Sequence, residues 1–273
     1  MKSQPLIFPR RILAIVAHPD DETMLAGGTL ALLAQAGAEV HYLCATRGEG
    51  GEMGEPPLSD RPGLGALRTA EMRCAVQALG GASLAFMDYT DPLVGADNQL
   101  HPYTSDWGTL LDKLQGTIQA LQPQAIITHG SNGEYGHPAH RLTHRAVREV
   151  LRRPDAGTPG PLLYTFSASF LGHPKPRLAN QDDQAHLVLD IRPVLEQKTA
   201  AAWCHRSQHA LFVRRASLQA GRPLSVPEVL MTVESLHRVF PPLRRGQPRD
   251  ALASLLAPWQ QASHQPTLGQ ESA

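Results

Sequence analysis

Two carboxylates and an imidazole stand together in the Ala-His-Pro-Asp-Asp-Glu sequence of residues 17–22. They follow an apolar run, residues 12–16, that predicts a buried strand, and they precede a helical pattern over residues 22–36. His18, Asp20 and Asp21 therefore lie where a strand becomes a helix, which is where ligands bind in open α/β sheets. Their charges repel phosphate and attract a divalent cation. A nucleotide-binding protein would carry a glycine fingerprint at this turn, so that hypothesis is disfavoured.

A second histidine-bearing junction follows the predicted strand at residues 125–128. The Tyr-Gly-His-Pro-Ala-His sequence of residues 135–140 offers two imidazoles, His137 and His140, three residues apart. His18 and Asp21 have the same spacing, so their side chains can converge while Asp20 points elsewhere. A His, Asp, His set that leaves positions open for water is typical of catalytic zinc. Zinc lowers the pKa of its bound water to about 7, which makes the adjacent Asp20 carboxylate the candidate general base.

Strands and helices alternate along the chain. The predicted strands are residues 12–16, 40–44, 83–87, 125–128, 162–165 and 186–189; the predicted helices are residues 22–36, 67–79, 106–121, a segment that follows residue 140 and runs to about residue 152, and residues 194–208. Short joints between strand, helix and strand predict right-handed βαβ units, and hence an α/β fold with a mostly parallel sheet. Residues 46–65 are rich in Gly, Pro and Glu, which predicts a loop over the site.

Length and charge limit the domain organisation and the partners. The chain has 273 residues, 42% of them hydrophobic, which predicts one large domain over residues 1–244. Residues 245–273 are rich in Pro, Gln and Ser and predict a loosely ordered C-terminal tail. The chain has 25 basic and 25 acidic residues, so its formal net charge is zero and no long-range field favours nucleic acid or an anionic membrane. A small molecule is the expected partner.

Three cysteines, Cys44, Cys74 and Cys204, lie far apart and form no Cys-x-x-Cys pair. An odd count at such spacing predicts neither a disulfide framework nor a thiolate zinc site, and it favours a reducing, cytoplasmic setting. The apolar run at residues 12–17 is too short for a signal sequence, and no run approaches the roughly 18 residues of a membrane span. We therefore expect a soluble, unexported protein.

The two junction motifs, Ala-His-Pro-Asp-Asp-Glu and Tyr-Gly-His-Pro-x-His, resemble those of the LmbE/PIG-L family of zinc-dependent N-acetylglucosaminyl deacetylases, of the mycothiol- and bacillithiol-biosynthesis type. The resemblance covers roughly the first 210 residues. It extends to the Thr-Arg-Gly-Glu sequence of residues 46–49, to Arg68 with Glu71, to Asp91, and to Lys198 with the His-Arg-Ser-Gln sequence of residues 205–208. It implies a Rossmann-like three-layer fold with helices on both faces of the sheet, which agrees with the alternation above.

The resemblance also implies a role for each matching residue. His18, Asp21 and His140 would hold one zinc ion per chain, and Asp20 would activate the water. His137 would protonate the departing amine or help to hold the oxyanion, to which Tyr135 would also contribute. Arg68, Asp91, Arg47 and Glu49 would contact the substrate. Ferrous iron is an alternative to zinc, because sites of nitrogen and oxygen ligands accept both. A trimer or hexamer would fit what relatives often form.

One departure concerns the residue between the two histidines of the second motif. The family often has Asp there, whereas this chain has Ala139. An imidazole beside a carboxylate is more basic and better oriented, so His137 is expected to have a lower pKa and to need another partner.

Several other interpretations remain. Asp20 and Asp21 could simply cap a helix. His144 lies one helical turn from His140 and could compete as a ligand, but we rank it as a packing residue or as a support for the ligands, and His129 is a similar candidate near the site. The same zinc site could serve an amidase acting on thiol S-conjugates, or a zinc-containing sugar-binding protein without turnover.

Overall fold

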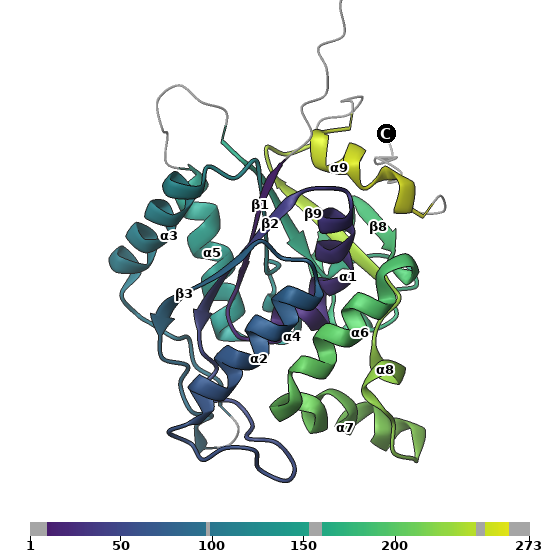
Figure 1. The fold of residues 1–273 in the computed structure, drawn as a ribbon. Helices are drawn as coiled ribbons and strands as arrows, with labels where there is room; N and C mark the ends of the chain where they lie inside the picture. The colour runs from purple at the N-terminus through teal and green to yellow at the C-terminus, as the bar shows by residue number, and fades with distance from the viewer. Residues whose placement is uncertain (1–9, 97–98, 153–159, 244–248, 262–273) are drawn as a thin grey trace, which may run out of the picture.

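The computed structural model describes residues 10–96, 99–152, 160–243 and 249–261, and its centre is a seven-stranded sheet in the order β3-β2-β1-β4-β5-β9-β8 (Figure 1). The strands are β1 (Arg11–Val16), β2 (Glu39–Thr46), β3 (Ser83–Tyr89), β4 (Ala125–Thr128), β5 (Leu162–Phe166), β8 (Leu187–Asp190) and β9 (Val233–Phe240); β6 (Ala168–Ser169) and β7 (Asn180–Gln184) form a separate pair. Only β9 runs against the other strands of the large sheet. The predicted α/β fold with a mostly parallel sheet is confirmed.

Helices cover both faces of this sheet. They are α1 (Asp21–Gln35), α2 (Leu64–Ala78), α3 (Trp107–Leu121), α4 (Gly133–Gly136), α5 (Pro138–Arg152), α6 (Leu195–Cys204), α7 (His209–Ala220), α8 (Val226–Val229) and α9 (Ala251–Leu255). Side chains alternate between the faces of a strand. Ile12, Ala14 and Val16 accordingly join the core that contains buried residues of α1, α2 and α6. Leu13 and Ile15 join the other core, with buried residues of α3 and α5.

The strand order changes direction beside β1, and this positions the two motifs. The chain adds β2 and β3 on one side of β1 and then β4 and β5 on the other. β1 and β4 are parallel neighbours, with Ile15 opposite Thr128. The segments that leave the carboxyl ends of β1 and β4 therefore emerge side by side, at the point where open α/β sheets bind their ligands.

Several elements in the second half of the chain were not predicted. β9 lies within the sheet between β5 and β8, although no strand is predicted at its residues. The predicted helix 194–208 ends at Cys204, and a 3₁₀ turn, Arg206–Gln208, leads into α7.

Part of the predicted loose tail is ordered. In α9 and just beyond it, Leu252 and Leu256 are fully buried in the core beside β8 and β9. Asp250 caps α9 through Ala253 N and accepts hydrogen bonds from Tyr164 and Arg238. The expectation of a loose tail is therefore wrong for residues 249–261, because two buried leucines and a buried ion pair hold this segment. Residues 245–248 and 262–273 lie outside the described residues, and the domain boundary at residue 244 stays a prediction.

The cysteines also correct an expectation. Cys74 of α2 and Cys204 of α6 form a disulfide with their Cα atoms 5.7 Å apart, and Cys44 is free and buried. The two cysteines are 130 residues apart in sequence, so their spacing did not reveal that α2 and α6 pack together. Cysteine usage thus gives no support to a reducing compartment. None of the helices among the described residues is long and apolar enough to cross a membrane.

Candidate metal centre and active site

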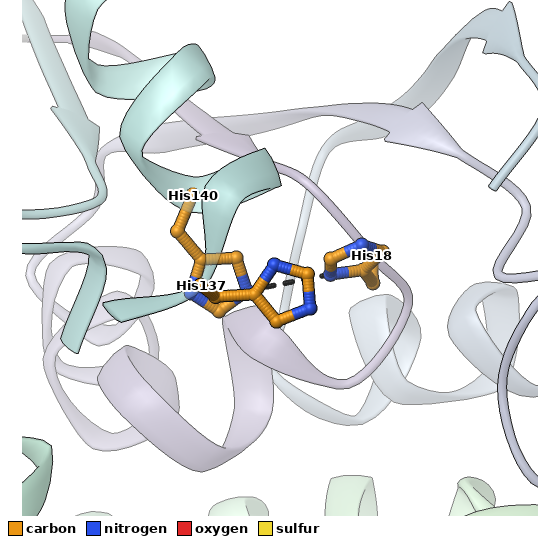
Figure 2. A group of neighbouring side chains, drawn as sticks. All are labelled: His18, His137 and His140. Atoms are coloured by element: carbon orange, nitrogen blue, oxygen red, sulfur yellow. Dashed lines mark hydrogen bonds between the residues drawn. The ribbon is translucent and has the colours of Figure 1, made fainter. Parts of the chain in front are cut away.

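The two sequence motifs meet at the carboxyl ends of β1 and β4. His18, from the turn between β1 and α1, points toward His140 in the first turn of α5, and His137 lies beside both (Figure 2). The His18 Nδ1 and His140 Nε2 atoms are 3.3 Å apart. Residues 122 positions apart in sequence therefore present ring nitrogens to one point.

Asp21 completes the predicted set of metal ligands. Its Oδ2 lies 3.3 Å from His18 Nδ1 and its Oδ1 lies 3.3 Å from His140 Nε2. All three residues are at most 7% exposed. Two imidazole nitrogens and one carboxylate that converge in a buried position are the donor types that zinc takes in catalytic sites. The residues present fit a divalent cation.

Two further carboxylates fix the orientation of these imidazoles. Glu134 Oε2 accepts hydrogen bonds from His140 Nδ1 at 2.6 Å and from His129 Nδ1 at 3.0 Å. Burial alone would raise the pKa of Glu134, but the two imidazoles hold it well below its usual range, so the carboxylate stays ionised. Asp91 Oδ1 lies 3.3 Å from His18 Nε2. Carboxylates placed behind metal-binding imidazoles select the tautomer whose other nitrogen faces the ion.

Glu134 was missed by the sequence analysis. It lies in the Gly-rich segment between β4 and His140, with φ 57°, a left-handed conformation that gave no recognisable local signal. Its second oxygen, Oε1, accepts from Gly130 N and from Asn180 Nδ2, and Asn180 belongs to β7, far along the chain. The support for His140 thus comes from two segments, the one that holds Gly130 and Glu134 and the strand β7, and folding brings them together.

His129 and His144 lie close to the centre but are not oriented as ligands. His129 Nε2 is 3.5 Å from Asp21, and Asp21, His129 and His140 are close enough to form a cluster of potential ligands. However, the Ala17 backbone N–H donates to that same nitrogen at 3.0 Å, so its lone pair is already used. His144 Nδ1 donates to the His129 carbonyl. Both residues therefore pack around the candidate ligands.

Asp20 faces the same cavity and is held by Arg68. Arg68 Nη2 lies 3.1 Å from Asp20 Oδ2 and also donates to the Pro19 carbonyl, while Nη1 donates to the Gly48 carbonyl at 3.0 Å. Burial raises the pKa of Asp20 to about 6, against the opposing effect of the Arg68 charge. A carboxyl group with a pKa in this range can accept a proton near neutral pH and release it again.

Arg68 also shapes the loop that was predicted to cover the site. A side chain at Gly48, whose φ is +71°, would collide with the Arg68 guanidinium, so glycine is required there. Gly50, Gly51, Glu52 and Arg61 of this loop line the cavity, as the sequence predicted.

His137 and Tyr135 lie on the open side of the three candidate metal ligands, His18, Asp21 and His140, which we call the metal cluster. The His137 ring stacks on His140 with centroids 4.4 Å apart, and Tyr135 meets His140 edge-on at 5.5 Å. Burial and the neighbouring imidazoles lower the pKa of His137 to about 3, so the ring is neutral. Its Nδ1 accepts the Ala139 backbone N–H at 3.2 Å, which leaves the proton on Nε2. The backbone N–H of Ala139 thus takes the Nδ1 atom of His137, the atom to which a neighbouring Asp would otherwise bind.

The four residues predicted to contact substrate divide into two pairs. Asp91 and Arg68 line the cavity, although both Nη atoms of Arg68 already donate within the protein. Arg47 and Glu49 are not among the lining residues. Arg47 pairs with Asp88 at 2.6 Å and stacks on Phe86, and Glu49 accepts from the Asp91 backbone N–H at 3.0 Å. Arg47 and Glu49 thus each have a partner within the protein, and their contact with substrate stays a prediction.

The C-terminal residues of the resemblance lie against the back of the site. His205 Nε2 lies 2.7 Å from Glu22 Oε1, and Glu22 Oε2 accepts the Asp20 backbone N–H at 2.9 Å. Ser207 donates to Glu71 of α2 through its backbone N–H and its hydroxyl. These contacts dock the end of α6 on α1 and α2, and they fix the backbone on which Asp20 is displayed.

The cavity in front of the metal cluster has a volume of about 680 Å³. Its metal-side wall contains His18, Asp20, Asp21, Arg68, Asp91 and His137; the remaining lining residues are Gly50, Gly51, Glu52, Arg61, Pro92, Leu93, Val94, Leu100, His101, Tyr135, Gln208 and Leu211. This volume is large enough for a small-molecule ligand.

Solved structures with the same fold include the N,N'-diacetylchitobiose deacetylase of Pyrococcus horikoshii, with a TM-score of 0.59 and 19% identity over 85% of this chain and 84% of that one. The 4-carboxy-2-hydroxymuconate hydratase GalB of Pseudomonas putida KT2440 aligns with a TM-score of 0.60 and 23% identity over 88% of this chain and all of that chain. These likenesses show the fold alone. The two named activities differ, so the fold by itself does not determine the reaction.

The relatives identified by sequence carry the name of one deacetylase. A 1D-myo-inositol 2-acetamido-2-deoxy-alpha-D-glucopyranoside deacetylase of Thermobifida fusca is 39% identical over 55% of this chain and 58% of its own length, so the match spans little more than half of that relative. An enzyme of the same name from Thermomonospora curvata is 34% identical over 73% of this chain and 80% of its own length. Residues 13–151 match the family described as "PIG-L: GlcNAc-PI de-N-acetylase". The chain therefore belongs to the PIG-L deacetylase family.

Proposed function

We propose that this protein is a metal-dependent hydrolase that removes the N-acetyl group from a small molecule containing N-acetylglucosamine. The observation that carries the proposal is the convergence of His18, Asp21 and His140, the first two of which line one cavity together with Asp20. The family membership and the deacetylase relatives support the choice of an acetamide as the scissile group.

His18, Asp21 and His140 would hold the metal, and zinc is the ion that we propose for this donor set. When bound, such an ion polarises a carbonyl oxygen and lowers the pKa of a neighbouring water. Glu134 and Asp91 keep the two imidazoles in the tautomers that face the ion.

Asp20 acts as the general base in this proposal. With a pKa of about 6 it takes a proton from the attacking water at neutral pH, and it can then pass that proton to the departing amine. Arg68 holds the carboxylate in place from the side, and the Glu22–His205 pair supports the backbone beneath it.

His137 serves as a neutral hydrogen-bond donor. Because its Nδ1 accepts from Ala139, its Nε2–H is the group available to the acetamide oxygen as negative charge develops there. Tyr135, half-exposed at the same edge, supplies a hydroxyl on the open side of the site. A donor aimed at developing charge does not need to ionise, so a histidine with a pKa of about 3 suits this role.

The experiment compares Asp20→Asn with His140→Ala. Purified protein is loaded with zinc, its metal content is determined by elemental analysis, and primary amine released from N-acetylglucosaminyl substrates is quantified. Asp20→Asn should keep the metal and lose about 10²- to 10⁴-fold in rate, the usual contribution of a general base. His140→Ala should lose the metal as well. Full activity of Asp20→Asn would overturn the assignment of the base.

A further inference from the structure

The lining of the cavity is charged beside His18 and Asp21 and aliphatic at the rim, where the cavity opens to solvent. Beyond the charged side chains, its wall carries aliphatic side chains that reach solvent: Leu93 is 60% exposed, Val94 48% and Leu211 45%. Pro92 and Leu100 line the same region. Singly exposed aliphatic residues need no explanation, but several that line one cavity indicate a binding surface.

These aliphatic residues are continuous with the metal cluster. Leu93 and Val94 follow Asp91 in the segment after β3, and Asp91 Oδ1 lies 3.3 Å from His18 Nε2. Leu211, near the start of α7, follows Gln208, which also lines the cavity. A ligand whose acetamide lies at the metal cluster would therefore extend along Leu93, Val94 and Leu211 toward solvent.

Three polar side chains that line the cavity, those of Arg61, Glu52 and Gln208, form hydrogen bonds within the protein. Arg61 Nη1 donates to the Glu49 and Gly51 carbonyls at 2.9 and 2.6 Å. Glu52 accepts both of its carboxylate hydrogen bonds from Arg214, and Gln208 Nε2 donates to the Glu52 carbonyl. A polyol placed here would find few unengaged partners among these groups, whereas an apolar group would cover the exposed leucines.

We propose that the natural substrate carries an apolar group, alkyl or aryl, on the side of the amino sugar remote from the acetamide, and that Leu93, Val94 and Leu211 bind it. The inference rests on the proposed deacetylase function and narrows its substrate class. The proposed substrate differs from the one for which the relatives are named, an inositol glycoside whose second ring is a polyol.

The energetics of burial give the size of the expected effect. Transfer of one methylene from water to an apolar surface strengthens binding by up to about fourfold. A hexyl glycoside has five more methylenes than a methyl glycoside, and an open rim buries only part of each. We expect the hexyl compound to exceed the methyl compound by about tenfold or more in kcat/KM and in affinity.

The test uses methyl, butyl and hexyl glycosides of N-acetylglucosamine with the zinc-loaded protein. Amine release gives kcat/KM, and calorimetry on Asp20→Asn gives the Kd of each compound without turnover. Leu93→Ser and Leu211→Ser should reduce the hexyl-to-methyl ratio to near one. Leu218→Ser is the matched control, because Leu218 is also on α7 and is 78% exposed but lines a different groove. The hexyl-to-methyl ratio of Leu218→Ser should equal that of the unaltered protein.

The outcomes separate this inference from the function on which it rests. No amine release from any glycoside would overturn the deacetylase proposal, while the Kd series would still show whether the rim binds an apolar group. Ratios near one in both measurements, or ratios that the rim variants leave unchanged, would overturn the inference. If the ratios are flat and Leu211→Ser also dissociates an oligomer in light scattering, a second copy of the chain covers the rim, and the inference is equally wrong.

Discussion

Glu134 shows how much of the candidate metal centre depends on a residue that is not one of its proposed ligands. Its carboxylate accepts four hydrogen bonds, from His129, His140, Gly130 and Asn180. Because every partner donates, the group must be an ionised carboxylate with both oxygens available as acceptors. It thereby fixes the protons of His129 and His140 on Nδ1 and directs the His140 Nε2 lone pair toward Asp21 and His18.

Glu134→Gln tests this arrangement at the scale of a single residue. Glutamine preserves the shape but places an amide NH₂ opposite donors, so His140 loses its fixed orientation. We expect the affinity for zinc to fall by about 10- to 100-fold, the usual effect of removing a carboxylate behind a metal-binding histidine. Chelator competition measures the Kd. Glu196→Gln, at an exposed position of α6, is the control. Equal affinities in the two variants would show that Glu134 does not position His140.

At the scale of elements, a buried ion pair ties β9 to the helices of one face. Lys198 of α6 lies 2.6 Å from Glu234 Oε1 of β9, and both side chains are almost completely buried. Glu234 also accepts from the backbone N–H groups of Gly28 and Thr29 in α1, and from the Thr29 hydroxyl. One carboxylate thus joins a strand of the sheet to two helices that flank the Asp20 turn.

Lys198→Met should destabilise the fold strongly. Removing one partner of a buried pair leaves an uncompensated charge, at a cost of about 3–5 kcal/mol in the free energy of unfolding. Urea denaturation followed by circular dichroism measures this change. Asp190→Asn breaks a more exposed pair with Arg192 and should hardly move the midpoint, because exposed pairs contribute little. Similar midpoints for both variants would mean that Lys198 is not required to compensate Glu234.

The disulfide makes a second link between elements, from α2 to α6. A cross-link across 130 residues restricts the unfolded chain, so its loss should lower the free energy of unfolding by about 2–4 kcal/mol. Cys74→Ser combined with Cys204→Ser should therefore melt at a lower temperature than the unaltered protein. The unaltered protein should melt at that lower temperature only after reduction. Thiol titration of the denatured, unreduced protein should find one free thiol, from Cys44. Three free thiols would contradict the disulfide.

The elements that could be predicted are those whose signal is local. β1 and α1, and β4 and α5, follow from apolar runs and helical spacing, and their shared edge follows from parallel topology. β9 has no comparable pattern, because Glu234 is buried and Arg238 is nearly so, and each is matched by a partner elsewhere in the chain. The Cys74–Cys204 bond and the hydrogen bond from Asn180 to Glu134 likewise depend on segments that approach only after folding. The other three partners of Glu134 lie within six residues of it. Local pattern therefore placed the candidate metal ligands at one edge of the sheet but did not identify Glu134, which supports His140.

At the scale of the whole molecule, a net charge of zero coexists with a strongly acidic site. Asp20, Asp21, Asp91 and Glu134 surround the imidazoles, and Arg68 is the cation paired with Asp20. Carboxylates held this close together disfavour one another's charge unless a cation lies among them. The ligands come from the ends of β1 and β4, so a bound ion would join two halves of the sheet that are otherwise linked through strand pairing and packing.

Zinc should therefore stabilise the entire fold. A ligand that binds only the native state at 100 times its Kd adds about 2.7 kcal/mol to the free energy of unfolding, so the melting temperature should rise with zinc and fall after chelation. His140→Ala should abolish this response, because it removes a ligand that β4 and α5 position. Glu134→Gln should shift the response to higher zinc concentration without removing it. An undiminished rise in His140→Ala would mean that zinc stabilises the protein from another location, and the convergence of the two motifs would then have no thermodynamic consequence.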